Sequence, residues 1–308
     1  TSIKSAIRKN KMKMRDSKYD YCIIGAGPSG LTMAYKILQG GYNVLVVERE
    51  SRVGGLAKSF NYDGHIFDTG PKRFHTDDPI VVEFIHHVMD MIPIKRSTKV
   101  YFLERYFEWP LTAKDILKMP MNISIKSLLD MLNKREIKDS SSFHEFISSK
   151  YGETLYSIFF EPYTRKFLRW DPEDIHSDWA STGINRTVID KRLENQTNTL
   201  FDMVKSLMLP GKIDTEFLYP TEGGFGGFYE KLLTLCQCYE SFHVIYEDTI
   251  DKLEDNGHKF SALTRNGESF YFDQLIWSGN LNDLLVVIAQ TDLKVNYLNT
   301  VFYNIICK

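Results

Sequence analysis

The chain has 308 residues, of which 43% are hydrophobic and 25% charged, and its formal net charge is −2. This length and composition predict a globular protein of about two domains with a sizeable core. The nearly balanced charge excludes a global basic field, so we expect no nucleic-acid partner. The longest apolar runs fall far short of the ~20 residues that a membrane helix needs, so we expect no integral membrane segment.

Residues 1–18 carry seven lysines and arginines against a single acid, Asp16. We expect a disordered or non-native leader there. An organellar transit peptide, or a natural start at Met12 or Met14, is the alternative. Without such a transit peptide, we expect the protein to be cytoplasmic.

A strand–turn–helix–strand pattern follows. The apolar run Tyr21–Ile24 predicts a buried parallel strand, Pro28–Gln39 a helix, and Tyr42–Val47 a second strand. The turn between the first strand and the helix reads Gly25-Ala26-Gly27-Pro28-Ser29-Gly30. Gly25 permits the tight turn, Gly27 lets a pyrophosphate approach the backbone, and Gly30 brings helix and strand close together. The pattern predicts a dinucleotide-binding unit with the pyrophosphate at the helix N-terminus.

Glu48 ends the second strand, 18 residues after Gly30, where a carboxylate can accept hydrogen bonds from a ribose 2′-hydroxyl. Arg49 could meet a 2′-phosphate, but the neighbouring carboxylate repels that group, so NADP is disfavoured. Gly54 and Gly55 follow Glu48 by six and seven residues. This spacing is similar to the FAD fingerprint of amine oxidase-like flavoproteins, in which the glycine pair lies against the pyrophosphate.

The chain becomes mostly helical between residues 80 and 210. An apolar stripe predicts a helix over Ile80–Met91, and two short strands follow at Val100–Leu103 and Tyr106–Trp109. Further helices are predicted at Ile125–Asn133, Ser142–Lys150, Glu153–Phe160 and Thr199–Met208. Ser142 has Glu145 three residues on, which is the spacing of a capping box.

Strand patterns return after a helix predicted at Phe228–Cys236. They cover His243–Tyr246, Lys259–Thr264, Ser269–Phe272 and Gln274–Trp277, with Asn266-Gly267 as a hairpin turn. Val295–Cys307 also reads as a strand, and we expect the chain to end within a domain. The predicted order is a leader (1–18), a first FAD-domain part (19–79), a helical substrate domain (80–210), a second FAD-domain part (211–280) and the start of a return to the substrate domain (281–308).

The four cysteines do not have the spacing of a zinc site. We therefore predict no metal, and we expect buried or free thiols rather than disulfides. The cysteines are Cys22, Cys236, Cys238 and Cys307.

Three further blocks carry a family resemblance. Residues 64–76 read GHIFDTGPKRFHT, residues 160–166 read FEPYTRK, and Asp178-Trp179-Ala180 follows. With the fingerprint, these blocks resemble the FAD-dependent amine oxidase and protoporphyrinogen oxidase-like flavoproteins, and also the UDP-galactopyranose mutases. The resemblance implies an α/β fold, in which a Rossmann-like FAD-binding domain with a parallel sheet and a β-meander is interrupted by a mostly helical substrate-domain insertion.

The resemblance also implies the site residues. FAD would be held by Gly25, Ala26, Gly27, Pro28, Ser29, Gly30, Glu48, Arg49, Gly54, Gly55, Leu56, Ala57, Gly70, Pro71, Ile250 and Ser278. Lys72, Arg73 and His75 are catalytic candidates in a loop against the flavin, where a cation stabilises the reduced ring. The substrate candidates are Tyr163, Lys166 and Tyr219.

Each of these roles has a plainer alternative. Residues 72–75 could form a solvated basic loop, Tyr163 could be a core aromatic, and the glycines at 223–227 could simply permit a tight turn into a helix. His86 and His87 point in different directions on a helix and are assigned core or surface roles.

The leading functional hypothesis is an FAD-dependent oxidoreductase that moves hydride from a small organic substrate to flavin N5. Lys72 occupies the position of the usual histidine, and Leu168 replaces the tryptophan that helps mutases to hold UDP. A mutase acting on a nucleotide sugar is the alternative enzyme, and a truncated, non-catalytic homologue is the third hypothesis. The substrate, the electron acceptor and the oligomeric state are left open.

Overall fold

The computed structural model describes residues 18–76, 78–95, 99–108, 115, 117–132, 141–179, 216–257, 259–290 and 292–306. The predicted leader up to residue 17, the helix predicted at Thr199–Met208, and Cys307 lie outside these residues. The chain divides into two compact units. Unit 1 comprises Thr1–Ile94 and Glu216–Lys308, and unit 2 comprises Lys95–Thr215. The division of the chain into functional domains stays a prediction.

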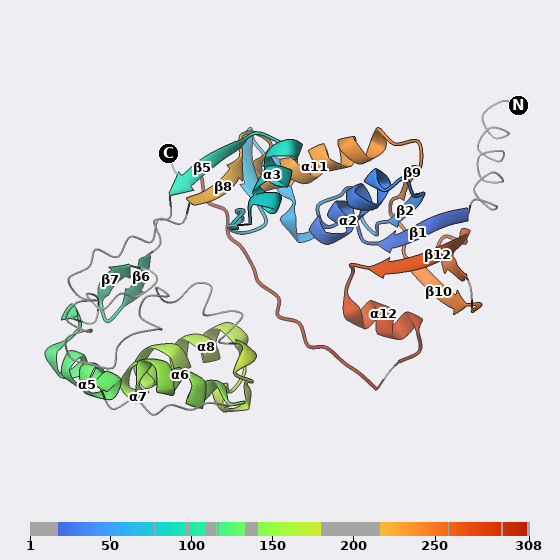
Figure 1. Cartoon of the computed structure of the whole chain (residues 1–308). Coiled ribbons are helices and arrows are strands. Elements are labelled where there is room, and N and C mark those ends of the chain that lie inside the picture. Colours follow the sequence, from blue (N-terminus) through green and yellow to red (C-terminus); the bar gives the residue numbers. More distant parts are fainter. Residues whose placement is uncertain are drawn as a thin grey trace, which may run out of the picture. The chain divides into compact units, whose positions relative to one another are not determined.

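Unit 1 is built on a six-stranded sheet of order β10-β11-β12-β1-β2-β9 (Figure 1). Strands β12, β1, β2 and β9 run parallel, and β10 and β11 join antiparallel at one edge. The strands are β1 (Lys18–Ile24), β2 (Val44–Val47), β9 (Phe242–Ile245), β10 (Ile250–Asp255), β11 (Phe260–Thr264) and β12 (Ser269–Trp277). The strands predicted at Ser269–Phe272 and Gln274–Trp277 form one continuous strand, β12. The predicted α/β class with a Rossmann-like unit is confirmed.

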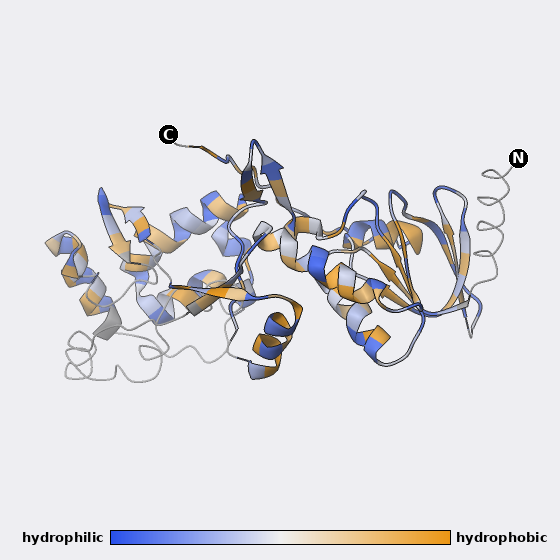
Figure 2. Cartoon of the chain, turned by 90° about the horizontal axis from the view of Figure 1, so that it is seen from above, coloured by the Kyte–Doolittle hydropathy of each residue, from blue (hydrophilic) through white to orange (hydrophobic). Residues whose placement is uncertain are grey.

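Every residue of β2 is buried, as expected for a parallel strand that is covered on both faces. Two cores account for this burial. On one face, Ile23 and Val46 pack in a cluster with residues of helices α2 (Pro28–Gln39), α3 (Pro79–Val88) and α11 (Gly224–Gln237). On the other face, Cys22 and Leu45 pack with residues of β10, β11 and β12. Figure 2 shows apolar residues along the central strands, whereas the helices carry both apolar and polar residues.

The predicted helix Pro28–Gln39 is confirmed with the same bounds. Helix α3 was assigned by sequence to the helical segment, yet it packs in unit 1 because Ile85 and Val88 are buried in the core cluster that includes α11. The Asn266-Gly267 hairpin turn is also present. Thr264 N–H donates to Glu268 O at 2.8 Å, and Gly267 has φ +84°.

Smaller elements complete unit 1. Strands β3 (Ser59–Tyr62) and β4 (His65–Asp68) form a hairpin, β5 (Met91–Lys95) pairs with β8 (Glu216–Pro220), and η1 (Gly55–Ala57) and α12 (Leu281–Val287) are short helices. The strand predicted from residue 295 onward is wrong, because residues 292–306 have no strand assignment. Alternating apolar side chains alone do not make a strand, since a strand also needs a backbone partner. Cys22, Cys236 and Cys238 are free thiols, as predicted.

Unit 2 contains a hairpin and several helices around an aromatic core. The core includes Phe107, Phe143, Ile147 and Phe160, which are at most 2% exposed. The elements are β6 (Lys99–Phe102), β7 (Arg105–Glu108), α5 (Met121–Leu132), α6 (Phe143–Tyr151), α7 (Glu153–Leu155), the π-turn η2 (Tyr156–Phe160), α8 (Glu161–Leu168) and η3 (Pro172–Asp174). Helix α6 starts at the predicted cap, because the Ser142 hydroxyl oxygen accepts from Glu145 N–H at 3.5 Å.

Candidate functional site

Three glycines of the turn after β1 differ in what surrounds them. Gly25 has φ +99°, which favours glycine. A β-carbon at Gly30 would lie 1.9 Å from the carbonyl oxygen of Gly25, so this glycine lets helix α2 approach the strand. A β-carbon at Gly27 would meet nothing nearer than Gly55 Cα at 3.9 Å, and φ there is −73°. Packing within the chain therefore does not require glycine at position 27, and the absent side chain leaves space beside the backbone.

The N-terminus of α2 faces this space. Gly27 is its N-cap and supplies no side-chain hydrogen bond, and Pro28 occupies the first turn. No acid lies in that first turn, and Ser29 is exposed. Backbone N–H groups at such an end carry a partial positive charge and bind anions. A pyrophosphate therefore fits the residues that line this turn.

Glu48 is buried at 5% exposure behind the turn. One of its carboxylate oxygens accepts from Ala26 N–H at 2.6 Å, and the other accepts from Glu50 N–H at 3.0 Å. The carboxylate thus ties the glycine turn to the chain after β2. Each oxygen has a second lone pair, so the carboxylate can still accept a hydroxyl hydrogen bond. Arg49, by contrast, is exposed and pairs with Asp283 at 3.8 Å.

A second glycine turn lies against the first. Gly54 N–H donates to Ala26 O at 2.9 Å, and Gly54 and Gly55 have φ of +104° and +51°. A β-carbon at Gly55 would fall 3.1 Å from Gly27 Cα. The two turns thus meet through their glycine backbones, at Gly27 and Gly55. The short helix η1 that follows exposes Leu56 and buries Ala57.

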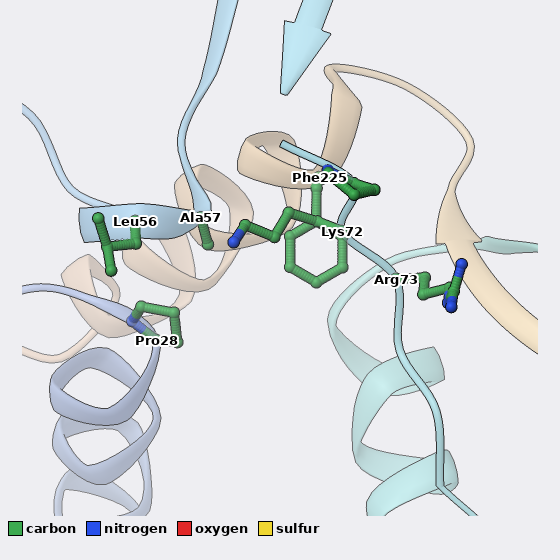
Figure 3. A pocket seen from close by; sticks show the side chains of 7 residues that line it. Pro28, Leu56, Ala57, Lys72, Arg73 and Phe225 are labelled. Atoms are coloured by element: carbon green, nitrogen blue, oxygen red, sulfur yellow. The ribbon is translucent and has the colours of Figure 1, made fainter. Parts of the chain in front are cut away.

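These turns border a cavity of about 350 Å³, which is also lined by Pro71, Lys72 and Arg73 (Figure 3). The Lys72 side chain extends toward Ala57, whereas the Arg73 side chain points away. The remaining lining residues are Pro28, Leu56, Ala57 and Phe225. The cavity therefore lies between the two glycine turns, the loop at residues 71–73 and the start of α11, and of its two cationic lining residues Lys72 extends toward Ala57 while Arg73 points away.

Arg73 and His75 both pack on a buried aromatic ring that the sequence did not indicate. The Arg73 guanidinium is 4.0 Å from the centre of the Phe217 ring, and the His75 ring meets the same ring edge-on at 5.1 Å. Phe217 belongs to β8, more than 140 residues further along the chain. The basic loop is therefore divided. Lys72 faces the cavity, and its two predicted partners pack on Phe217.

A polar network covers the N-terminus of α11. Asp68 accepts from Phe225 N–H at 2.9 Å and from the Tyr219 hydroxyl at 2.7 Å, and Ser59 donates to Asp68. The Ser59 hydroxyl oxygen accepts from Gly226 N–H at 2.7 Å. Burial and the Asp68 hydrogen bond raise the pKa of Tyr219 to about 12, so its hydroxyl stays a donor. A substrate role for Tyr219 therefore competes with this network.

The glycines predicted to precede a helix at Phe228 lie in the first turn of α11, where they serve packing within the chain, as in the plainer alternative. A β-carbon at Gly224 would meet Ser59 Oγ at 2.6 Å, and one at Gly226 would meet Ser59 N at 2.5 Å. These glycines let the helix end approach the β3–β4 hairpin. The sequence shows Asp68 only as part of a motif and does not reveal the network, because its hydrogen bonds join residues up to 167 positions apart.

Two predicted cofactor residues serve the structure itself. The Ser278 hydroxyl donates to the carbonyl oxygens of Ile24 and Gly25 at 3.0 and 3.1 Å, which holds the end of β1. The side chain of Ile250 is 5% exposed and lies in the core below the sheet. Only its backbone is left for the predicted contact with FAD. Gly70 has φ +78° and begins the cavity loop.

Tyr163 and Lys166 lie on α8 in unit 2, and both are exposed. Tyr163 belongs to a row of nearly parallel rings. It stacks on Phe159 at 6.2 Å and on Phe167 at 5.8 Å, and Phe167 stacks on Trp179 at 6.0 Å. Tyr163 is 46% exposed, so the row offers a partly open aromatic surface.

His144 of unit 2 lies between two carboxylates, an arrangement that the sequence did not indicate. Its Nε2 lies 3.0 Å from a Glu153 oxygen and its Nδ1 lies 3.1 Å from a Glu173 oxygen. Its ring stacks on Tyr156 with centres 4.2 Å apart. Partial burial alone would lower the pKa of His144, but the hydrogen bond and charge of Glu153, together with Glu173, outweigh burial and raise the pKa.

The part of the chain that the structure describes lacks both a membrane-spanning helix and a metal-binding cluster. No helix in this part of the chain is both long and apolar enough to cross a bilayer. Among the same residues, no group of three or more histidines, cysteines and acids is arranged to hold a metal ion.

Residues 23–88 match the family model described as an NAD(P)-binding Rossmann-like domain. The chain is 26% identical over 160 residues to the "Probable UDP-galactopyranose mutase" of Klebsiella pneumoniae, a match that covers 50% of this chain and 42% of the relative. It is 25% identical over 169 residues to protoporphyrinogen oxidase 2, chloroplastic/mitochondrial, of Arabidopsis thaliana, covering 50% of this chain and 33% of the relative. These matches thus span less than half the length of either relative.

The fold is similar to a crystal structure of reduced UDP-galactopyranose mutase. The TM-score is 0.73 at 20% identity, and the superposition covers 87% of this chain and 57% of that chain. The predicted resemblance to mutases and protoporphyrinogen oxidases is therefore confirmed, and residues 23–88 are similar to an NAD(P)-binding Rossmann-like domain.

Proposed function

We propose that this chain binds FAD and is a flavin-dependent enzyme. The observation that carries the proposal is the open space beside Gly27, which lies at the uncapped N-terminus of α2 and faces a second glycine turn. A diphosphate needs such a surface of N–H groups without side chains. Glu48 would accept from the ribose, and Gly54 and Gly55 would lie along the diphosphate. The relatives, which are named mutases and oxidases, support the same assignment.

For the reaction, we propose an oxidoreductase acting on a small organic molecule. When bound, the flavin would accept a hydride from a substrate C–H bond. The role of this chain is to bind the cofactor, exclude water and supply a cation. We assign that last role to Lys72, because it extends into the cavity while Arg73 packs on Phe217. A fixed positive charge favours the anionic reduced state of a flavin.

The second candidate is a mutase that acts on a nucleotide sugar. Its specific support is the row of parallel rings Phe159, Tyr163 and Phe167 in unit 2, since an open aromatic face can stack a nucleobase. Leu168 replaces the tryptophan that helps mutases to hold UDP, which speaks against a mutase. The row of parallel rings supplies another stacking surface and therefore offsets this replacement. We propose unit 2 as the substrate domain in either case.

Titration of the purified protein with FAD tests the cofactor assignment. We expect a yellow complex with micromolar or tighter affinity, and a protein that fails to bind added FAD would refute it. Lys72→Met should lower the two-electron midpoint potential of the bound flavin by about 30 mV, equivalent to ~1.4 kcal/mol. Arg73→Met is the matched control and should leave the potential unchanged. Equal shifts in both variants would contradict the assignment to Lys72.

The two reactions are separated by their electron balance. Under anaerobic conditions, an oxidoreductase substrate should bleach the oxidised flavin, and an electron acceptor should restore its colour. A mutase needs the flavin reduced beforehand and consumes no electrons. Calorimetric titration of the reduced protein with UDP distinguishes them further. Micromolar UDP affinity that is lost in Tyr163→Ala would place the mutase first.

A further inference from the structure

The extended segment 292–306 is anchored to the N-terminus of α12. Val295 N–H donates to Asn282 Oδ1 at 2.9 Å, and Asn282 Nδ2 donates to Val295 O at 2.8 Å. The Asn282 amide thus imitates the backbone of a neighbouring strand. The Tyr297 hydroxyl oxygen also accepts from Leu281 N–H at 3.1 Å. Beyond these contacts, the segment runs away from α12 as an extended trace (Figure 1).

A second contact joins this segment to the loop that lines the cavity. The ring of Phe302 lies over the α-carbon of Gly70, where a β-carbon would fall 2.4 and 2.5 Å from two ring atoms. Phe302 is 43% exposed, whereas its neighbours Val301 and Tyr303 are 72% and 85% exposed. Phe302 is therefore the side chain at this point that turns toward the protein. Only glycine allows a ring to come so close to the backbone.

The loop that Phe302 covers is held at its two ends but little between them. Gly70 N–H donates to Asp68 O at 2.8 Å, and Phe74 exchanges two backbone hydrogen bonds with Leu218. Among the described residues, no backbone hydrogen bond of this kind holds Pro71, Lys72 or Arg73. A loop with few hydrogen bonds opens locally at low cost. Packing of the Phe302 ring is thus an added restraint on the part of the loop that carries Lys72.

We propose that Phe302 is a positioning residue for the cofactor site: its ring clamps Gly70 and so keeps the Lys72 ammonium in the cavity. The inference rests on the proposed function in that the cavity is taken to receive FAD. Phe302 acts only through the loop, and no contact between it and the cofactor is implied.

Two neighbouring aromatic residues provide a matched test, Phe302→Ala with Tyr303→Ala as its control. The first readout is the rate at which Lys72 is reductively methylated in the cofactor-free protein, followed by mass spectrometry. We expect Phe302→Ala to raise this rate about fivefold, because the loop opens more often. Tyr303→Ala should leave it unchanged. Phe302→Leu, which keeps part of the ring's volume, should give an intermediate rate and serves if the alanine variant unfolds.

The second readout is the dissociation constant and visible spectrum of the FAD complex. Phe302→Ala should weaken FAD about fivefold and shift the flavin band, because Lys72 is less often in place. Equal Lys72 rates in Phe302→Ala, Phe302→Leu and the parent protein would overturn the clamp. A faster Lys72 rate in a protein that binds no FAD would support the clamp and refute the proposed function, so the two failures are distinguishable.

Discussion

Gly27 and Gly30 belong to the same glycine-rich sequence, yet the structure predicts different effects when each is replaced by alanine. Gly27→Ala and Gly30→Ala each add one β-carbon. At Gly27 that carbon meets nothing nearer than 3.9 Å and φ is negative, so alanine fits without strain. At Gly30 it would lie 1.9 Å from the carbonyl oxygen of Gly25. Gly27→Ala should therefore impair the site and Gly30→Ala the fold.

The magnitudes follow from these distances. At Gly27, alanine is a poorer N-cap than glycine, which lowers the free energy of unfolding by up to ~1 kcal/mol. Alanine also reduces the conformational entropy of the unfolded chain, which raises the free energy of unfolding by about 0.4–1 kcal/mol. The free energy of unfolding should thus change by less than about 1 kcal/mol. At Gly30, the two atoms must separate by more than about 1 Å to reach van der Waals contact. Such overpacking typically costs about 1–3 kcal/mol or more.

Thermal unfolding of cofactor-free protein and FAD titration measure the two effects separately. Gly27→Ala should move the Tm by no more than about 4 °C while weakening FAD at least about tenfold, or ~1.4 kcal/mol. Gly30→Ala should lower the Tm by more than about 4 °C. Unchanged FAD affinity in a folded Gly27→Ala protein would refute the placement of the diphosphate. A Gly30→Ala protein as stable as the parent would refute the steric argument.

Three further predictions concern single side chains. Glu48→Gln should keep the fold but weaken FAD by roughly 1.5–3 kcal/mol per charged hydrogen bond lost, and an unchanged dissociation constant would make Glu48 only a structural acid. Ser278→Ala removes the hydroxyl that donates to Ile24 O and Gly25 O, while the Ser278 N–H still donates to Ile24 O, so the Tm should fall by a few degrees for ~1 kcal/mol; no change in Tm would contradict this role. The raised pKa of His144 adds stability that is fully present below its unfolded pKa and is lost as the pH rises through the folded pKa. His144→Gln should remove this loss of stability with rising pH. The measurement is the Tm of the parent and the variant between pH 5 and about 8. A parent protein whose stability rises over that range would contradict the predicted direction.

The βαβ unit could be predicted because each of its signals is local. Pro28–Gln39 starts after a glycine turn and ends before Gly40-Gly41, and the helix has those bounds. The cavity loop shows where local signals fail. The sequence groups Lys72, Arg73 and His75 as one basic cluster, whereas Arg73 and His75 pack on a ring from β8 and Lys72 extends into the cavity. The sequence of residues 70–76 gives no indication that Phe217 packs against this loop.

The roles of individual glycines are likewise hard to predict from the sequence. A glycine needed for a close approach, one needed for a positive φ and one left open for a ligand are identical letters in a sequence. Gly226 is crowded by Ser59, whereas Gly27 has open space, although both occur in glycine-rich sequences at the start of a helix. The first supports the plain alternative of a tight turn, and the second supports a binding surface. Only the atoms brought close by distant parts of the chain tell the two apart.

The network around Asp68 bears on how the site is held. Its carboxylate joins Ser59 of β3, Tyr219 of β8 and the N-terminus of α11, and Gly70 follows it by two residues. The negative charge at the positive end of α11 is favourable, so this helix end is already occupied by the chain itself. The N-terminus of α2 has no such acid. Of these two helix ends with glycine-rich turns, only that of α2 is left free for an anionic ligand, and this difference is the strongest structural reason to place the diphosphate at Gly27.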